Sequence, residues 1–419
     1  MKENHIIKSN QYSRQPFWFK MVNGIWKKTY ILGSETILEV DSLLKAAKKE
    51  TGLNDFGKDF WVEPLQVLVK SMNEEANLHP IGRFISRQRL INLLCVRLRA
   101  EYYFKKHPDI LKQELYPCTI IVGLQRTGTT KLQRLLAADP DSRSLLSWEA
   151  LNPSPIKKDI TTGKERIKMA KTSVKALQYM SPSFFAIHPI EFDAPEEDVL
   201  LLDVSFMSTT AEATMHVPTY ASWLEKNDQS PGYQYMVKLL KLLQWQRPAK
   251  RWILKTPHHL EFLPLVKKHL GDVQFLWTHR DVKECVPSFL SMVAYSRVLF
   301  SNDVHTDAVA RHWLKKNAYM LSKALEFRHE KGNNDLFTDI RYKDLVEDSF
   351  LVLERIYQGH NEVISDGLAK TFKEANLKNP KSKYGVHHYE MGDFGIDASY
   401  FNEYSVNYQE FQRHLGMHI

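Results

Sequence analysis

The sequence predicts an α/β fold in which helices flank a parallel β-sheet, with a helical region before the sheet and a helical insertion within it. Two apolar runs support this prediction, because such runs are typical of central parallel strands. The first is Ile120–Val122 and the second is Val273–Thr278. A glycine-rich turn and an amphipathic helix follow the first run. The 419 residues suffice for one elaborated domain or for two closely joined ones.

Residues 1–115 are expected to form a helical N-terminal region. Ser34 is a candidate N-cap for a helix that ends at Gly52, since Ser favours the position before a helix and Gly the position after it. A second helix should begin near Pro80, because leucines follow at four-residue spacing. The α/β domain is then expected to comprise residues 116–419.

Within the α/β domain, residues 153–247 are predicted to be a helical insertion. Pro153 and Pro155 interrupt the chain after the first crossover, and the sheet should resume near Lys250. Such an insertion would lie over the carboxyl edge of the sheet, where open α/β folds bind ligands. Some of its large apolar side chains are candidates to line a pocket, but most are expected to be helix core. These side chains are Tyr179, Phe184, Phe185, Phe206, Met207, Met215, Tyr220 and Trp223.

The turn after the first strand is the most informative segment of the chain. Gly123 and Gly128 enclose four residues, and a helix opens directly after Gly128. Such a loop directs backbone N–H groups and the positive end of a helix at one point, which attracts a phosphate-like anion. It departs from the nucleotide-triphosphate P-loop at Thr129, where that motif has Lys. Arg126 supplies a positive charge instead, and its planar fork suits a tetrahedral oxyanion.

These residues resemble the 5′-phosphosulfate-binding loop of the sulfotransferases that use 3′-phosphoadenosine-5′-phosphosulfate (PAPS). In that family the loop typically reads Pro-Arg/Lys-Ser/Thr-Gly-Thr-Thr, so the chain departs from the pattern at its first position. The resemblance implies a P-loop-NTPase-like parallel sheet, PAPS as cosubstrate and no metal. It also implies a cosubstrate contact at each residue of the loop, namely Gln125, Arg126, Thr127, Gly128, Thr129 and Thr130.

A second motif of the family, which holds the 3′-phosphate, is an Arg at a strand end followed by a Ser eight residues later. Arg280 and Ser288 have this spacing after the second apolar run. An Arg fork and a Ser hydroxyl can meet one phosphate from two sides. The alternative is that Arg280 pairs with Asp281 or Glu284 at the surface. The loop upstream favours the phosphate site.

Four further segments resemble a larger, bacterial-type branch of these enzymes, in which a helical lead-in precedes the α/β domain. They are Thr51–Gly57, Leu78–Arg83, Arg341–Val346 and His387–Gly395. These segments are less specific than the two binding motifs. They extend the resemblance over most of the chain.

Sulfuryl transfer requires a base for the acceptor proton, groups that stabilise charge on the sulfuryl oxygens, and a cation at the bridging oxygen that leaves with 3′,5′-bisphosphoadenosine. Arg126 and the amides and hydroxyls of Thr127–Thr130 fit the second requirement. Arg126 and Lys255 are candidates for the third. Lys255 follows the predicted strand Trp252–Leu254, where a side chain would point into the cleft.

The base has two principal candidates. In the cytosolic branch of the family the catalytic His lies two residues after the Lys, but Pro257 is inserted here and two histidines follow it. We prefer His259 over His258, because the branch that this chain resembles usually has His-Leu at this place. The competing base is Glu197, in the acidic cluster Glu196–Asp198. That cluster either presents a carboxylate to the acceptor or is a solvated helix start, and the sequence favours neither.

The amino-acid composition indicates which binding partners and which cellular compartment to expect. The net charge of +8 suits an anionic cosubstrate, but the basic residues are scattered and no zinc-finger spacing is present, so a nucleic-acid partner is not expected. Three widely spaced cysteines favour a reducing compartment. No stretch has the length of a signal-peptide core or of a transmembrane helix, so we expect a cytoplasmic protein without a membrane span.

The predicted function is transfer of a sulfuryl group from PAPS to a hydroxyl of a small or lipid-like acceptor. One alternative is a P-loop kinase for a small molecule, which the missing Lys and the lack of a strand-end carboxylate for Mg²⁺ disfavour. Another is a non-catalytic nucleotide-binding protein of the same fold, which would not need to retain Lys255 and the histidines.

Overall fold

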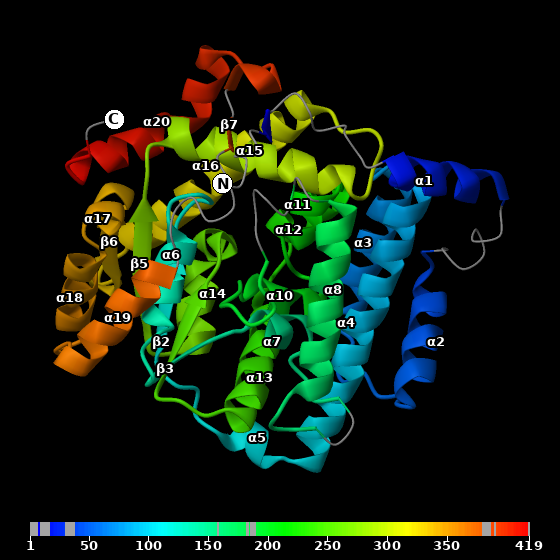
Figure 1. Cartoon of the computed structure of the whole chain (residues 1–419), viewed down its shortest axis with the longest axis horizontal. Coiled ribbons are helices and arrows are strands. Elements are labelled where there is room, and N and C mark those ends of the chain that lie inside the picture. The colour runs from blue at the N-terminus through cyan, green and yellow to red at the C-terminus, as the bar shows by residue number, and fades with distance from the viewer. Residues whose placement is uncertain are drawn as a thin grey trace.

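The computed structural model describes residues 7–8, 17–29, 38–156, 159–181, 184, 190–378, 387–388 and 391–417. Figure 1 shows a β-sheet flanked by helices on one side of the molecule and a layer of long helices on the other. The strands of the sheet are β2 (Cys118–Val122), β3 (Ser142–Ser144), β4 (Arg251–Lys255), β5 (Val273–His279) and β6 (Phe337–Arg341). A separate parallel pair joins β1 (Ile7–Lys8) to β7 (His387–His388).

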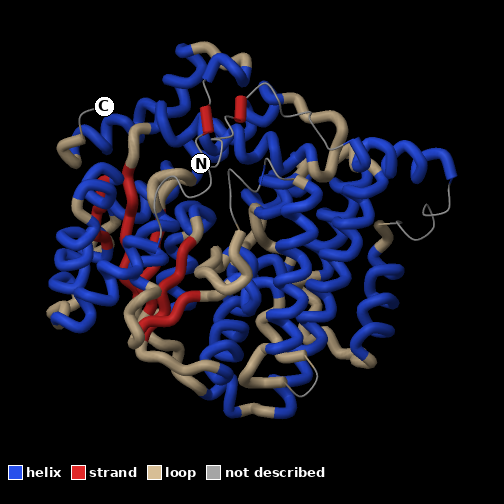
Figure 2. The backbone as a smooth tube through the Cα atoms, in the orientation of Figure 1, coloured by secondary structure: helices blue, strands red, loops and turns tan. Residues whose placement is uncertain are grey.

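The five strands of the sheet run parallel in the order β3–β4–β2–β5–β6. β2 is therefore central, and all of its residues are buried. Because successive side chains of a strand point to opposite faces, Ile120 and Ile121 enter different apolar clusters. Helices cover the sheet on both faces (Figure 2). The prediction of a parallel sheet flanked by helices is confirmed.

The register of the sheet brings three strand ends together. Ile121 of β2 pairs with Lys255, the last residue of β4, and Val122 pairs with Trp277 near the end of β5. The carboxyl ends of parallel strands form one edge of a sheet. The loop after β2, the segment after β4 and the residues after β5 are therefore neighbours at this edge.

The helices of the α/β domain divide between the two faces of the sheet. α6, α17, α18 and α19 contribute side chains to the cluster around Ile121, whereas α13 to α16 and α20 contribute to the larger cluster around Ile120. The bounds are α6 (Thr129–Leu136), α7 (Ser147–Leu151), α8 (Lys164–Met180), α10 (Val199–Leu202), α11 (Thr210–Thr214), α12 (Pro218–Lys226), α13 (Ser230–Gln246), α14 (Leu263–Leu270), α15 (Val282–Val298), α16 (Thr306–His329), α17 (Tyr342–Glu347), α18 (Ser349–Gly359), α19 (Asp366–Lys378) and α20 (Ala398–His414).

The N-terminal region is helical, as predicted. Its helices are α1 (Phe17–Thr29), α2 (Val40–Thr51), α3 (Val62–Glu74), α4 (Pro80–Lys106) and α5 (Asp109–Lys112). The proposed cap Ser34 lies outside the described residues, and α2 begins only at Val40. α2 ends at Gly52, which has a left-handed backbone with φ 69°, and α4 begins at Pro80.

The segment 153–247 contains α8 and α10 to α13, and α13 leads back into β4. Most of its large apolar side chains are core. Phe206, Met215 and Tyr220, for example, join a cluster with the N-terminal helices. Across the part of the chain that the structure describes, no helix combines the length and the apolar character needed to cross a bilayer.

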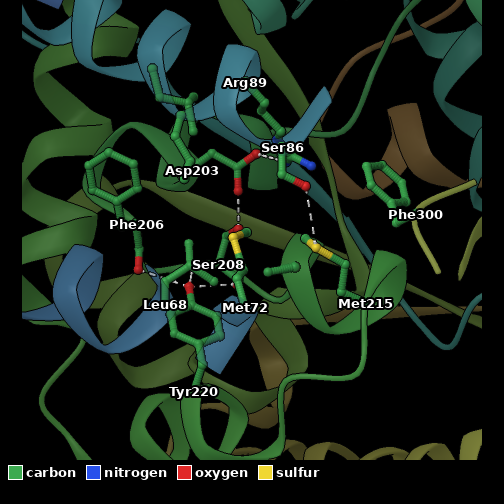
Figure 3. A pocket seen from close by; sticks show the side chains of 13 residues that line it. Leu68, Met72, Ser86, Arg89, Asp203, Phe206, Ser208, Met215, Tyr220 and Phe300 are labelled. Carbon is green, nitrogen blue, oxygen red and sulfur yellow. Dashed lines mark hydrogen bonds and ion pairs between the residues drawn. The ribbon is translucent and has the colours of Figure 1, made fainter. Parts of the chain in front are cut away.

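A small cavity lies where the N-terminal helices meet this segment. Figure 3 shows Arg89 paired with Asp203, and the hydroxyls of Ser208 and Tyr220 bonded nearby. The volume of the cavity is about 20 Å³, which is room for about one water molecule. At this volume the cavity is too small for a ligand much larger than water.

Candidate active site

The loop between β2 and α6 has a positive φ at three positions. Gly123 has φ 139°, Arg126 has φ 68° and Gly128 has φ 94°. A Cβ atom at Gly128 would lie 2.9 Å from Cδ2 of Tyr342, so glycine allows the loop to approach α17 closely. Gly128 is also the N-cap of α6, and the first N–H groups of a helix have no partner within the helix. The loop thus presents backbone donors at the carboxyl edge of the sheet.

The hydroxyl of Thr127 does not face an anion. It donates to the carbonyl oxygen of Leu124 at 2.6 Å and lies 2.7 Å from the hydroxyl of Thr278 on β5. Thr127 is completely buried. The hydroxyl therefore holds the loop on the sheet. Thr130, by contrast, is exposed at the start of α6.

The structure brings Arg126, Arg280 and Ser288 together from three different elements. Nε of Arg126 donates to Oγ of Ser288 at 3.1 Å. Nη1 of Arg280 donates to the carbonyl oxygen of Arg126 at 3.0 Å. Ser288 lies on α15 and is buried. The two motifs that the sequence analysis assigned to the two ends of PAPS are therefore in direct contact.

Arg280 also has the acidic partner that the alternative interpretation named. Its guanidinium pairs with Glu284 at 2.8 Å and lies over the ring of Tyr342, 4.4 Å from the ring centre. Asp281 instead caps α15 by accepting the N–H of Lys283 at 2.9 Å. The ion pair with Glu284 holds the Arg280 side chain beside the loop.

Lys255 and Glu197 form an ion pair at the end of β4. The Lys255 Nζ atom lies 2.7 Å from Oε1 of Glu197, and the hydroxyl of Thr256 donates to Oε2 at 3.3 Å. The Lys255 side chain is 4% exposed and that of Glu197 is 29% exposed. The acidic cluster is therefore docked against the sheet edge and is not a solvated helix start.

His259 is buried behind this pair. Its Nε2 lies 2.6 Å from Oδ2 of Asp198, and its Nδ1 lies 2.9 Å from the hydroxyl of Tyr233. Oδ1 of Asp198 accepts the backbone N–H of Lys255 at 2.8 Å. Both ring nitrogens are thus bonded within the protein, and the side chain is 0% exposed. In this position His259 holds the side chain of Asp198. Asp198 in turn holds the backbone of Lys255, so it keeps Glu197 and Lys255 side by side.

A pocket of about 200 Å³ opens at the carboxyl edge. Glu197 and His258 line it, and so does Gln125 of the loop. His258 lies with its Nδ1 3.2 Å from Oγ1 of Thr209. Burial lowers the pKa of its imidazole well below the ordinary value, so the ring is neutral. Of the large apolar residues that the sequence analysis named in the insertion, Phe184 lines this pocket.

A buried ion network backs the pocket. Lys316 on α16 lies 2.7 Å from Glu261 and 3.1 Å from Glu225. Burial disfavours charge on Lys316, yet the neighbouring carboxylates raise its pKa above the ordinary value. Glu212 on α11 pairs with His312 of α16 at 2.9 Å. These contacts join α11, α12, α16 and the 3₁₀ turn that contains His258 and Glu261.

Sequence reasoning missed the roles of several of these residues. Asp198 was named only as part of the acidic cluster and Thr278 only as the end of an apolar run, and Tyr233 was not named. All three act through contacts with residues far away in the chain, so no local pattern marks their roles. Tyr342 was discoverable, because it directly follows the end of β6 at the carboxyl edge. Within the described ranges, no group of three His, Cys, Asp or Glu side chains is arranged to hold a metal ion.

Comparisons with known proteins agree with the fold. The family model described as "Sulfotransferase family" matches residues 117–361, which is more than half of the chain. The sulfotransferase STF1 from Mycobacterium tuberculosis H37Rv has a similar structure, with a TM-score of 0.78 and 27% sequence identity over 89% of this chain and 99% of that chain. The sulfotransferase STF9 from Mycobacterium avium shares the fold, with a TM-score of 0.81 and 24% identity over 90% of this chain and 97% of that chain. A search of curated protein sequences found no match.

The matched residues contain the whole five-stranded sheet, the loop between β2 and α6, Arg280, Ser288 and the Lys255–Glu197 pair. On this coverage, the chain belongs to the sulfotransferase family.

Proposed function

We propose that the protein is an enzyme that transfers a sulfuryl group from PAPS to a hydroxyl of a small or lipid-like acceptor. The observation that carries the proposal is the position of the Lys255–Glu197 pair. Glu197 lines a pocket at the carboxyl edge, and the same pocket is lined by Gln125 from the anion-binding loop. A base, a cation and an anion loop thus meet where an acceptor can enter.

The donor site is supported by the contact between Arg126, Arg280 and Ser288. Two guanidinium groups and the N-terminus of α6 give this place the charge needed for a nucleotide with two separate anionic groups. The residues Gln125 to Thr130, together with Arg280 and Ser288, would contact PAPS. In this assignment Thr127 contributes its backbone N–H, because its hydroxyl is bonded to Leu124.

The proposed reaction is an in-line displacement at sulfur. The acceptor oxygen bonds to sulfur, the bond between sulfur and the bridging oxygen breaks, and the products are a sulfate ester and 3′,5′-bisphosphoadenosine. Glu197 takes the proton of the acceptor hydroxyl. Lys255 stabilises the charge that develops on the bridging oxygen, and Arg126 stabilises the sulfuryl oxygens.

In this mechanism Glu197 replaces His259 as the favoured base. A base must come within hydrogen-bond reach of the proton that it takes. Glu197 lines the pocket, whereas His259 is buried with both nitrogens bonded. His259 is proposed to be a positioning residue that acts through Asp198. His258, which lines the pocket, is the remaining candidate if neither residue is the base.

Calorimetry with nucleotides tests the donor site. We expect 3′,5′-bisphosphoadenosine to bind without Mg²⁺ and far more tightly than AMP, because AMP lacks the 3′-phosphate. Arg280→Ala should weaken this binding by roughly 1.5–3 kcal/mol, the usual contribution of a charge-assisted hydrogen bond. Tight binding of ATP·Mg²⁺ instead would favour the kinase alternative.

The matched control for Arg280 is Arg311. Both guanidinium groups lie over a tyrosine ring, Arg280 over Tyr342 at 4.4 Å and Arg311 over Tyr400 at 4.9 Å. Arg311→Ala should leave the dissociation constant of 3′,5′-bisphosphoadenosine unchanged. Transfer itself is tested with sulfur-labelled PAPS and a panel of hydroxyl compounds. A protein that binds the nucleotide but labels no hydroxyl in the panel would contradict the proposal of transfer.

A further inference from the structure

We infer that the acceptor is a neutral, mainly apolar alcohol or phenol that buries only the hydroxyl that reacts, and that sugars, other polyols and carboxylated acceptors are excluded. This inference rests on the proposed function, because it concerns the acceptor side of the same site. It is carried by the partners of the polar side chains that line the pocket and by the sign of the charges there.

Among the described residues, the four threonine hydroxyls in the pocket wall are bonded to the protein, and Ser296 adds a fifth hydroxyl. Oγ1 of Thr209 lies 3.2 Å from His258, that of Thr214 donates to the carbonyl oxygen of Thr210 at 2.9 Å, and that of Thr256 donates to Glu197. Each of these residues lines the pocket. The wall therefore offers a ligand few partners, chiefly the amide of Gln125, whose Oε1 has no partner within the protein, and the hydroxyl of Ser296. A polyol would lose more bonds to water on entry than these groups replace, which disfavours its binding.

The charges in the wall have one sign. Glu196 and Glu197 are the charged side chains among the described residues that line the pocket, and both are carboxylates. Lys255 balances Glu197, while Glu196 accepts from the hydroxyl of Ser147 at 3.3 Å and from the backbone N–H of Glu197 at 3.0 Å. Lys255 is engaged by Glu197, and no cationic side chain is among the described residues that line the pocket. A carboxylate on the acceptor would therefore meet Glu196 and the anionic donor, which is unfavourable.

The remainder of the wall is apolar and partly aromatic. Phe289 and Trp313 meet edge to face with their ring centres 4.8 Å apart, and Met292 and Met320 extend the same surface. Such a wall suits an aromatic ring or a branched hydrocarbon. The volume of about 200 Å³ is ten times that of the cavity in Figure 3, so this pocket has room for a small molecule.

Two matched pairs of probes test this inference by equilibrium binding in the presence of 3′,5′-bisphosphoadenosine. Methyl 3-(4-hydroxyphenyl)propanoate and its free acid share one skeleton and differ in charge. Cyclohexanol and myo-inositol share one ring and differ in the number of hydroxyls. We expect the ester to bind at least about tenfold more tightly than the acid, and cyclohexanol at least about tenfold more tightly than inositol.

A variant of the wall tests the charge argument directly. Met292 lines the pocket and is only half-buried, so a longer polar side chain can be accommodated there. Met292→Lys should reverse the preference between ester and acid, whereas Met292→Leu should keep the wild-type preference. Thermal melting of both variants establishes that each is folded. Should Met292→Lys fail to melt cooperatively, the two probe pairs with the wild-type protein decide alone.

The outcomes separate this inference from the proposed function. Equal or tighter binding of the acid or of inositol by the wild-type protein overturns the inference, and so does the absence of binding by both neutral probes. If the neutral probes bind as expected but receive no labelled sulfuryl group from PAPS, the inference about the pocket stands and the proposed transfer fails. Transfer to inositol or to the acid overturns the inference while the proposed transfer stands.

Discussion

Single residues at the carboxyl edge differ in what their side chains can reach. Glu197 lines the pocket and is held by Lys255 and Thr256, so its carboxylate has a fixed direction. His259 lies one layer deeper, bonded to Asp198 and Tyr233. The sequence analysis named both as candidate bases, but of the two only Glu197 lines the pocket. We therefore expect substitutions at the two positions to have different effects.

Glu197→Gln should lower turnover by about 10²–10⁴-fold and leave binding of 3′,5′-bisphosphoadenosine nearly unchanged, because the amide cannot take a proton. His259→Gln should keep most of the turnover, since the Gln amide can still bond to Asp198. The measurements are kcat with labelled PAPS and the dissociation constant of the nucleotide. An inactive, folded His259→Gln beside an active Glu197→Gln would identify His259 as the base.

At the scale of elements, the β2–α6 loop depends on a glycine for two separate reasons. Gly128 has a left-handed backbone, and a Cβ there would meet Tyr342. Gly52, which ends α2, has a similar backbone with φ 69° but open space around it. Both Gly128→Ala and Gly52→Ala should lose roughly 1–2 kcal/mol of stability from the backbone alone.

Only Gly128→Ala should also weaken binding of 3′,5′-bisphosphoadenosine, because Tyr342 must move and Arg280 lies over its ring. Denaturant unfolding measures the stability of both variants, and calorimetry measures the binding. Normal nucleotide affinity in Gly128→Ala would show that the loop tolerates a shift of Tyr342. In that case the close approach would be a matter of packing and not of binding.

The start of α4 depends on a neutral histidine. Nδ1 of His79 accepts the N–H of Gly82 at 2.8 Å, which requires an unprotonated nitrogen. Burial lowers the pKa of His79 from 6.5 to about 4. Between these values the unfolded chain binds a proton that the folded chain does not bind. This group therefore lowers the stability as the pH falls through that window, by at most about 3 kcal/mol.

His79→Asn should reduce this pH dependence, because an Asn side chain can cap the helix but does not titrate. The measurement is the free energy of unfolding of wild type and variant at pH values of about 6.5 and about 4. As the pH falls, the free energy of unfolding should decrease less for His79→Asn than for the wild type. Parallel pH curves would show that His79 titrates alike in the folded and the unfolded chain.

At the scale of the whole molecule, the pocket is assembled from segments that are distant in the sequence. Its lining comes from the β2–α6 loop, the segment around α10 and α11, the turn after β4, and the long helices α15 and α16. Lys316 ties part of this wall together through Glu225 and Glu261. Burial raises the pKa of Glu261 to about 7, so this carboxyl changes its charge near neutrality.

Lys316→Met should lower the free energy of unfolding by about 3–5 kcal/mol, because it leaves buried carboxylates without their cation. The loss should be greater above about pH 7, where Glu261 ionises, than below it. Lys323 on the same helix is the control, since its pair with Glu326 is exposed and Lys323→Met should have little effect. Equal, small losses for both variants would contradict a structural role for the buried network.

Features that depend on neighbours in the chain could be predicted from the sequence. The strand, loop and helix around Gly128, the end of α2 at Gly52 and the start of α4 at Pro80 all follow from local backbone preferences. The Arg280–Ser288 spacing also placed these residues at the end of β5 and on α15. The predicted cap at Ser34 stays a prediction, because Ser34 lies outside the described residues.

The sequence by itself determined the parallel sheet, the glycine-containing loop between β2 and α6 and the family, because these depend on short patterns of glycine, apolar and charged residues. Only the tertiary structure decided which candidates are buried and which face the pocket. It enclosed His259 and left Glu197 at the pocket, although both lie within a few residues of expected catalytic motifs. The reason is physical: burial and hydrogen-bond partners come from contacts between residues such as Asp198 and His259, about 60 positions apart, and no local pattern records them.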